Sequence, residues 1–239
     1  MAHAKNVVSA PEFIHQTPIS DSLAAFASSL SWQDIPAQVV ERAKLHVLDA
    51  LGIALAASRY DYSHKTLTAM HGLAGNGPYP VIGMPARLPL RDAAQMNGFL
   101  IHALDFDDTH VAGVIHATCT AVSTLLGMGQ KYDISGREML IAYLAAVESD
   151  ARIGMGAKGG FHRKGFHPTG MVGAYGAAIA AGRAAGLTRA QLSDAQGIVL
   201  GMASGTLGFL DEGAWNKRLH AGWASVAGIT AAALARQGF

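Results

Sequence analysis

The stretch at residues 167–187 reads HPTGMVGAYGAAIAAGRAAGL and carries no charge between Pro168 and Gly182. Pro168 suits the first position of a helix, where its missing N–H breaks no hydrogen bond. Small side chains would let neighbouring helices approach closely, and here they are Gly170, Gly173, Gly176, Ala180 and Gly182. The run is shorter than the ~18–20 apolar residues that cross a bilayer. The stretch therefore predicts a buried helix of an all-α protein.

Further helices are predicted on both sides of this stretch. Apolar residues recur at helical spacing from Val39 to Leu55, after a start marked by Asp34 and Pro36. Ser20 or Asp21 is expected to cap an earlier helix. Thr188 and Gln191 form a capping box for the helix after the small-residue stretch. The remaining predicted helices span residues 63–73, 90–104, 117–130, 137–153 and 217–236.

No segment alternates as a β-strand does. The Gly- and Pro-rich residues 75–90, GNGPYPVIGMPARLPL, interrupt the helices and allow at most a short extended piece at Val81 and Ile82. No repeat or low-complexity linker divides the chain. The prediction is a multi-helix bundle of about nine helices over residues 18–239, after an N-terminal tail at residues 1–17.

Composition narrows the class of protein. Half of the residues are hydrophobic, 15% are charged and the formal net charge is +1, which argues against nucleic-acid and membrane-surface binding. The N-terminus lacks the basic start and apolar run of a signal peptide. Cys119 is the single cysteine, so no internal disulfide forms, and we expect it to be buried in a reducing, cytoplasmic setting.

The polar segment HALDFDDTHVAGVIH, residues 102–116, is the first candidate site. If the preceding helix continues through it, His102, Asp105 and Thr109 share one face, Asp108 is a neighbour of Asp105, and Asp107 points elsewhere. His116 follows a Gly-containing loop. A polar helix end is the alternative, but acidic residues at a helix C-terminus oppose the helix dipole. The pattern favours a carboxylate, hydroxyl and imidazole site.

Two basic segments are further candidates. KGGFHRKGFHPTG, residues 158–170, places His167 at the start of a helix, a favourable place for a carboxylate or phosphate. Its other cations, Lys158, Arg163 and Lys164, are more typical of a solvated loop. NKRLHAG, residues 216–222, places Lys217 and His220 beside an apolar helix, and a lysine is a point charge suited to a carboxylate.

The familiar motifs of other chemistries are missing from the sequence. It has neither the H-E-x-x-H spacing nor the paired cysteines of zinc sites, no Walker A, no strand followed by G-x-G-x-x-G, and no G-x-S-x-G elbow. A weaker alternative is that the aspartates hold Mg²⁺. The residues instead favour metal-free acid–base catalysis on a small anionic substrate.

Three segments resemble the MmgE/PrpD family, which includes 2-methylcitrate dehydratase, cis-aconitate decarboxylase and iminodisuccinate epimerase. They are NGFLIHALDFDDTH, GFHPTGMVGAYGAAIAAGRAAGLTRAQLSDAQGI and NKRLHAGWASVAGITAAALARQGF, and the similarity begins near residue 18. The resemblance implies the family's all-helical N-terminal domain. It also implies a homodimer and a lyase or isomerase that acts on a small di- or tricarboxylate without a cofactor.

The same resemblance assigns roles to single residues. The family's catalytic positions fall on Asp105, Thr109, His116, His167 and Lys217. We expect the adjacent polar side chains to contact the substrate, namely His102, Asp108 and His220. Lys217 would hold a substrate carboxylate, His116 and His167 would exchange protons, Asp105 would orient a histidine or take a proton, and Thr109 would donate a hydrogen bond.

The sequence departs from the family pattern in two ways. Ala117 follows His116, where the family usually has proline. The family also continues into a smaller α/β domain that is absent here, so the chain is expected to be incomplete relative to the family. Dehydration, decarboxylation and epimerisation all stay open. The alternative is a catalytically incomplete helical subunit that assembles with a partner chain carrying the missing domain.

Overall fold

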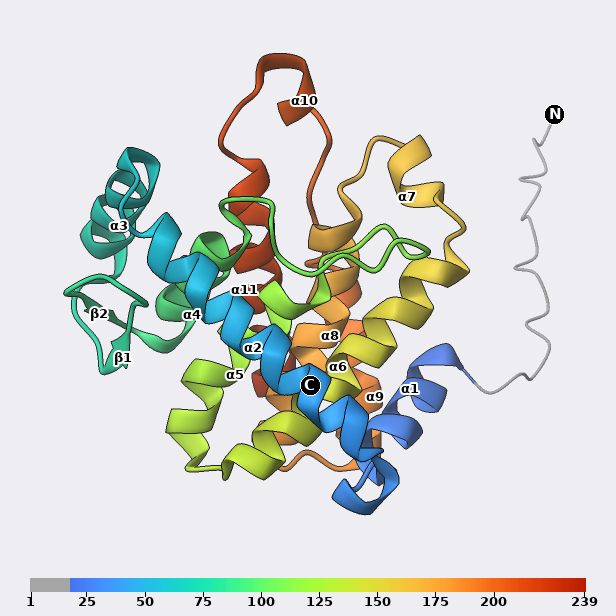
Figure 1. Ribbon diagram of the computed structural model, residues 1–239. Coiled ribbons are helices and arrows are strands. Elements are labelled where there is room, and N and C mark those ends of the chain that lie inside the picture. The colour runs from blue at the N-terminus through green and yellow to red at the C-terminus, as the bar shows by residue number, and fades with distance from the viewer. Residues whose placement is uncertain (1–17) are drawn as a thin grey trace, which may run out of the picture.

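The computed structural model describes residues 18–239 as a bundle of helices (Figure 1). The tail predicted at residues 1–17 lies outside the described residues. The helices are α1 (Ile19–Ser29), α2 (Ala37–Ala57), α3 (Asp61–Ala74), α4 (Leu90–His102), α5 (Ala117–Tyr132), α6 (Gly136–Gly156), α7 (Gly160–Arg163), α8 (Pro168–Ala184), α9 (Arg189–Leu200), α10 (Phe209–Glu212) and α11 (Lys217–Arg236). Of these, only α7 and α10 are single turns, so the predicted all-α class is confirmed.

Extended structure within residues 18–239 is limited to one pair of two-residue strands. β1 (Tyr79–Pro80) pairs antiparallel with β2 (Arg87–Leu88). The extended piece predicted at Val81 and Ile82 therefore lies two residues earlier, and the chain turns after Val81, where the N–H of Met84 donates to the carbonyl oxygen of Val81. In the described part of the chain, none of the helices has the length and apolarity that crossing a bilayer requires.

Local sequence signals place most helix starts. Pro168 occupies the first turn of α8, as predicted. Thr188 caps α9 by accepting the backbone N–H of Gln191. The prediction that Ser20 or Asp21 caps α1 was wrong, because Pro18 precedes the helix and both residues lie inside it. Asp21 instead forms an ion pair with Arg189, which joins α1 to α9.

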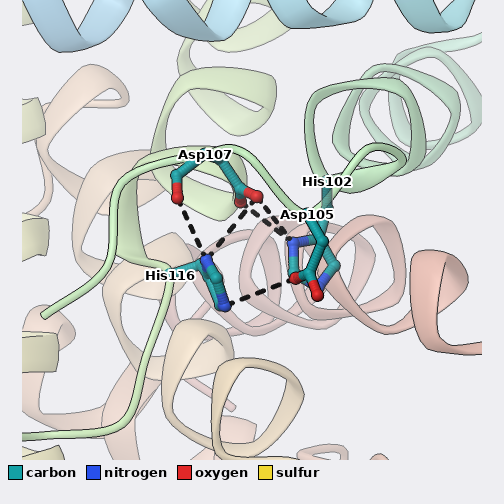
Figure 2. Close-up of side chains that lie close together, drawn as sticks. All are labelled: His102, Asp105, Asp107 and His116. Atoms are coloured by element: carbon teal, nitrogen blue, oxygen red, sulfur yellow. Dashed lines mark hydrogen bonds and ion pairs between the residues drawn. The ribbon is translucent and has the colours of Figure 1, made fainter. Parts of the chain in front are cut away.

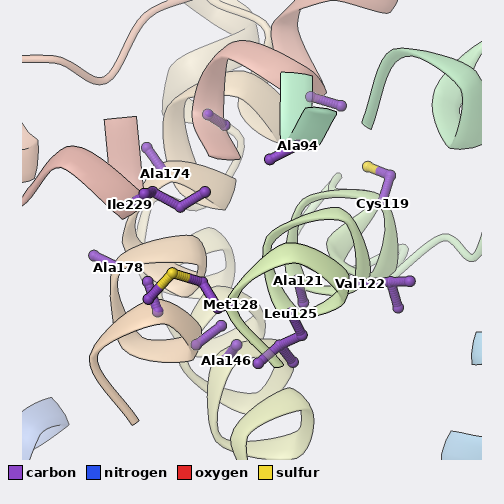
Figure 3. Packing of buried hydrophobic residues seen from close by; sticks show 14 of the residues in the cluster. Ala94, Cys119, Ala121, Val122, Leu125, Met128, Ala146, Ala174, Ala178 and Ile229 are labelled. Atoms are coloured by element: carbon purple, nitrogen blue, oxygen red, sulfur yellow. The ribbon is translucent and has the colours of Figure 1, made fainter. Parts of the chain in front are cut away.

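The core is built on the small residues of α8, which packs against α5, α6, α9 and α11. Figure 3 shows Ala174 and Ala178 of α8 beside Ile229 of α11, all fully or almost fully buried. A Cβ added at Gly228 of α11 would lie 2.5 Å from the backbone of Ala177. The predicted close approach of helices is thus confirmed, and it leaves no room for another methyl group.

The loops that follow α4, α6 and α9 gather toward one end of this bundle (Figure 1). The first runs from Ala103 to His116, the second carries α7, and the third carries α10. An isolated bridge between Phe166 and Thr206 ties the second loop to the third. Gly113 of the first loop packs against Gly154 of α6, where an added Cβ would meet the Gly113 carbonyl oxygen at 2.9 Å. The rigid helices therefore bring three distant segments together here.

Candidate active site

The polar segment after α4 is a folded loop and not a helix extension. α4 ends at His102, and Asp105 has a left-handed backbone with φ of 59°. The prediction that His102, Asp105 and Thr109 share a helix face was therefore wrong. The loop still returns Asp105 to the site, where its Oδ1 accepts a hydrogen bond from Lys217 Nζ at 2.6 Å and lies 3.6 Å from His116 Nε2.

The Asp105 carboxylate is held ionised by its neighbours. Partial burial alone would raise its pKa, but the hydrogen bond and charge of Lys217, with the nearby histidines, lower that pKa overall. The side chain of Asp105 is 55% exposed, whereas that of Lys217 is 23% exposed. The pair therefore lies at the mouth of the site and offers one positive and one negative group to a ligand.

Asp107 lies at the centre of the histidines, contrary to the prediction that it points elsewhere. Its buried carboxylate is 2.9 Å and 3.1 Å from His102 Nδ1 and 3.5 Å from His116 Nδ1 (Figure 2). Burial would raise the pKa of Asp107, but the charge and hydrogen bond of His102, together with His116, lower it. The carboxylate is therefore ionised and accepts a hydrogen bond from His102.

His116 is the residue that precedes α5, and its ring is oriented by the loop before it. Nδ1 lies 3.2 Å from the backbone carbonyl oxygen of Asp107, which can only accept, so Nδ1 donates. Thr109 Oγ1 lies 3.4 Å from the same nitrogen. The backbone N–H of His116 donates to Thr169 Oγ1 of α8 at 3.1 Å. His116 thus reaches the site although alanine replaces the proline that the family usually has after it.

His167 and His220 form the other half of the site. Their Nδ1 atoms are 3.0 Å apart, so one ring donates its hydrogen to the lone pair of the other. Burial, reinforced by the charges of His102 and His220, lowers the pKa of His167 to about 2. Burial, with His102 and Lys217, lowers the pKa of His220 as well. Both rings are therefore neutral at pH 7.

The four imidazoles form a continuous row. Ring centroids are 4.8 Å apart from His116 to His102, 5.6 Å from His102 to His167, and 5.2 Å from His167 to His220. Phe209 of α10 covers the last two rings at 5.6 Å and 5.9 Å. The histidines come from α4, the loop before α5, the start of α8 and α11, so only the assembled bundle creates the row.

A hollow of about 230 Å³ adjoins this row. Its walls are made by His102, Ala103, Leu104, Asp105, Phe209, Leu210, Gly213, Ala214, Lys217 and Arg218. Arg218 donates to the carbonyl oxygen of Ala103 at 2.8 Å and stacks over Tyr62. The hollow therefore combines a cation, a carboxylate and an imidazole with an apolar cover.

Most of the residues selected from the sequence meet in this region. His102, Asp105, His116, His167, Lys217 and His220 are linked by the contacts above, with Thr109 at the edge. Asp108 does not join them, because its carboxylate accepts the backbone N–H of Thr118 at 3.1 Å and lines a different hollow with His46. Lys158, Arg163 and Lys164 are exposed, as expected for a solvated loop.

Sequence reasoning missed Asp107, Phe209 and Arg218. The position of Asp107 follows from the loop path, which helical spacing does not describe. Phe209 carries no sequence signal beyond being apolar, since its role comes from the tertiary position of α10.

Four of these side chains also resemble a metal-ligand set. His102, Asp105, Asp107 and His116 each place one ligand atom within 4.8 Å of the others. However, the Nδ1 hydrogens of both histidines already engage Asp107, and the lone pair on His116 Nε2 faces Asp105 at 3.6 Å, so a cation there would have to compete with Lys217 for Asp105. Lys217 also already supplies the positive charge beside Asp105. The donor set therefore fits proton sharing better than a cation.

A model of the MmgE/PrpD N-terminal domain matches residues 21–239. The chain belongs to the MmgE/PrpD family. The expected family membership is therefore confirmed, and the match covers the helices that carry every side chain of the site.

Curated relatives in this family are named as cis-aconitate decarboxylases. The one from Aspergillus terreus is 30% identical over 227 residues, which cover 92% of this chain and 46% of the relative. The human protein of that name is 31% identical over 227 residues, with the same shares. A cis-aconitate decarboxylase-like protein, oryM, from Aspergillus oryzae is 29% identical over 229 residues, or 92% of this chain and 47% of the relative. The chain thus spans about half the length of these relatives.

Proposed function

We propose that this MmgE/PrpD chain forms the helical part of a metal-independent acid–base lyase for a small di- or tricarboxylate. The observation that carries the proposal is the Lys217–Asp105 pair beside a row of four imidazoles at a small hollow. The relatives' names support decarboxylation of a cis-aconitate-like substrate. Dehydration of the 2-methylcitrate type and epimerisation use the same groups and are the alternatives within this proposal.

Lys217 is the proposed anchor for a substrate carboxylate. A second carboxylate at its ammonium group would compete with Asp105 for the three donors of that group. Because the side chain of Lys217 is only 23% exposed, its charge is screened less than that of a surface lysine. Binding would thereby loosen Asp105 and leave its carboxylate next to His116 Nε2 as a proton acceptor.

The histidines supply the proposed proton transfers. In a decarboxylation the electron pair of the breaking carbon–carbon bond stays on the substrate, carbon dioxide leaves, and a proton must reach the carbon. His116 is suited to deliver it from Nε2 after the Nε2 lone pair has taken up a proton from bound water, because Nδ1–H stays held by the Asp107 carbonyl. His167 is neutral at pH 7 and, because its pKa is lowered to about 2, serves first as a hydrogen-bond partner. General acid–base catalysis of this kind contributes typically ~10²–10⁴-fold.

Removing the charge of Lys217 tests the proposal. A Lys217→Met variant keeps the apolar stem, and we expect cis-aconitate to bind about 10–100-fold more weakly, as loss of a charged hydrogen bond implies. Lys44→Met is the matched control, since Lys44 pairs with Glu41 on the exposed face of α2. Calorimetry measures binding, and ¹H NMR follows the product, which separates loss of carbon dioxide from loss of water. Equal affinity of wild type and Lys217→Met would remove Lys217 as the anchor.

A second candidate is a helical unit that needs another polypeptide segment to complete the site. The exposed Asp105 carboxylate favours it, because the hollow is open on that side. In this case the chain would bind the carboxylate but turn it over only after a partner has been added. Light scattering of the chain, alone and mixed with a candidate partner, would detect that assembly. Turnover by a monomer alone would reject it.

A homodimer and a cytoplasmic location stay predictions.

A further inference from the structure

Asp107 makes contacts that no proposed catalytic role accounts for. Its side chain is 1% exposed, yet it carries a negative charge that must be matched by buried donors. In the described chain the side chains that offer such donors to it are those of His102 and His116, since the Cys119 thiol donates to the carbonyl oxygen of His116. A buried carboxylate beside an imidazole selects the tautomer of the ring, because the nitrogen that faces the carboxylate carries the hydrogen.

His102 shows the consequence most clearly. Both oxygens of Asp107 lie within 3.1 Å of its Nδ1, so Nδ1 carries the hydrogen. Nε2 of His102 is buried and has no hydrogen-bond partner in the described residues 18–239. An unpartnered buried polar atom costs about 1–3 kcal/mol, so a native structure usually has a reason to keep one. His102 also contributes to the wall of the hollow that holds Asp105 and Lys217.

His116 is oriented by the same residue through a different atom. Its Nδ1 donates to the backbone carbonyl of Asp107 at 3.2 Å, and the carboxylate lies slightly farther away at 3.5 Å. Nε2 is thereby left to face Asp105 Oδ1 at 3.6 Å. One residue therefore directs two imidazoles, one with its side chain and the other with its main chain.

We propose that Asp107 is a positioning residue that fixes Nδ1–H on His102 and leaves Nε2 of His102 as a further proton-exchange atom of the site. A proton moves from the substrate or a bound water to the Nε2 lone pair, and the resulting imidazolium is stabilised by the Asp107 carboxylate. In the return step, the His102 imidazolium gives this proton from Nε2 back to the substrate or the water. That His102 touches the substrate rests on the proposed function, whereas the positioning by Asp107 stands on the contacts alone.

Histidine tautomers measured by ¹⁵N NMR on the ¹⁵N-labelled chain test the positioning without any substrate. In the wild type, the neutral forms of His102 and His116 should both carry hydrogen only on Nδ1. In Asp107→Asn, the ratio of the two neutral tautomers of His102 should change by about 10-fold or more toward the Nε2–H form. His116 should change far less, because its carbonyl partner is retained.

Asp108→Asn is the matched control, since it makes the same chemical change one residue along the chain. It should leave both tautomer patterns as in the wild type, because Asp108 bonds to the backbone of Thr118. A wild-type His102 that carries its hydrogen on Nε2 would overturn the proposal even if Asp107→Asn did not fold. An equal response of His102 to both variants would also overturn it. Cis-aconitate binding is measured separately, so failure of the proposed function leaves the tautomer result interpretable.

Discussion

The crossing of α8 with α11 and the histidine row use opposite means to hold helices together. At the crossing, Gly228 lies against Ala177 and the contact contains only small apolar groups. At the row, buried imidazoles and carboxylates hold one another through hydrogen bonds 2.9–3.2 Å long. At the crossing, side-chain volume decides which substitutions are tolerated, since no further methyl group fits. At the row, the charges and the positions of the ring hydrogens decide it. An added methyl group should therefore destabilise the protein most at the crossing, whereas the loss of a charge or of a hydrogen-bond partner should matter most at the row.

Gly228→Ala should have the largest effect on stability. The added methyl would overlap the backbone of Ala177, which cannot move without separating α8 from α11, so we expect a loss of about 3 kcal/mol, at the upper end of the usual cost of overpacking. Gly197→Ala in α9 is the control, because nothing lies within 4 Å of its added Cβ. It should stabilise the protein by about 0.5–1 kcal/mol through helix propensity. Urea denaturation measures both, and equal responses would contradict the close crossing.

Asp150 of α6 tests a buried carboxyl inside the apolar region. Its Oδ1 accepts the backbone N–H of Gly176 at 2.8 Å, and complete burial raises its pKa well above 3.8. Asp150→Ala should cost about 1–3 kcal/mol by removing that acceptor, whereas Asp150→Asn keeps an oxygen there.

The pH dependence of these variants has a definite sign. Because the folded pKa of Asp150 is raised, its stabilising contribution is complete below 3.8 and is lost as the pH rises toward the folded pKa. The free energy of unfolding of the wild type should thus fall relative to Asp150→Asn above pH 4, by at most about 1.4 kcal/mol per pH unit. Parallel pH curves for the two proteins would show that Asp150 is ionised in the core.

His167 tests the polar region by the opposite pH effect. Its pKa is lowered from 6.5 to about 2 by burial, so the stability that it contributes is present above 6.5 and is lost as the pH falls. His167→Asn should flatten the acid side of the stability curve by up to about 1.4 kcal/mol per pH unit. Denaturation from pH 7 to pH 4 measures it. If the free energy of unfolding of His167→Asn falls as steeply with falling pH as that of the wild type, a group other than His167 causes the acid destabilisation.

Metal removal should have the smallest effect. Lys217 already supplies the positive charge beside Asp105 that a substrate carboxylate needs, so we expect the protein treated with EDTA to bind cis-aconitate as the untreated protein does. Calorimetry with Zn²⁺ and Mn²⁺ checks the same four side chains directly. Tight binding of either ion that is lost in Asp107→Asn would contradict the interpretation as a proton-sharing site.

The sequence predicts the two regions unequally for a physical reason. Helix starts at Pro168 and Thr188 depend on neighbouring residues, and the small-residue spacing of α8 reports directly which helices approach closely. The loop after α4 depends on tertiary contacts. It contains two left-handed residues that are not glycine, Asp105 and Val114, which local preferences disfavour. Helical spacing therefore selected Asp105 correctly but misplaced Asp107.

The resemblance to the family supplied what spacing could not. The residue patterns had already selected His116, His167 and Lys217 in three distant segments; the resemblance implied that they serve one active site, and the structure brings these segments together. The resemblance did not indicate that Asp108 would turn toward Thr118, because neighbouring aspartates in one motif are chemically alike. The path of the loop alone determines that Asp107 contacts the histidines and that Asp108 caps the start of α5.

The most direct test of the account is a titration of the ¹⁵N-histidine-labelled chain with cis-aconitate, followed by NMR. The signals of His102, His116, His167 and His220 should shift together with one affinity, and Lys217→Met should weaken all four responses. His64 and His71 of α3 are internal references, because both lie outside the row and should not move. No shift in the four row histidines, or equal shifts in His64 and His71, would contradict the claim that they form one carboxylate site.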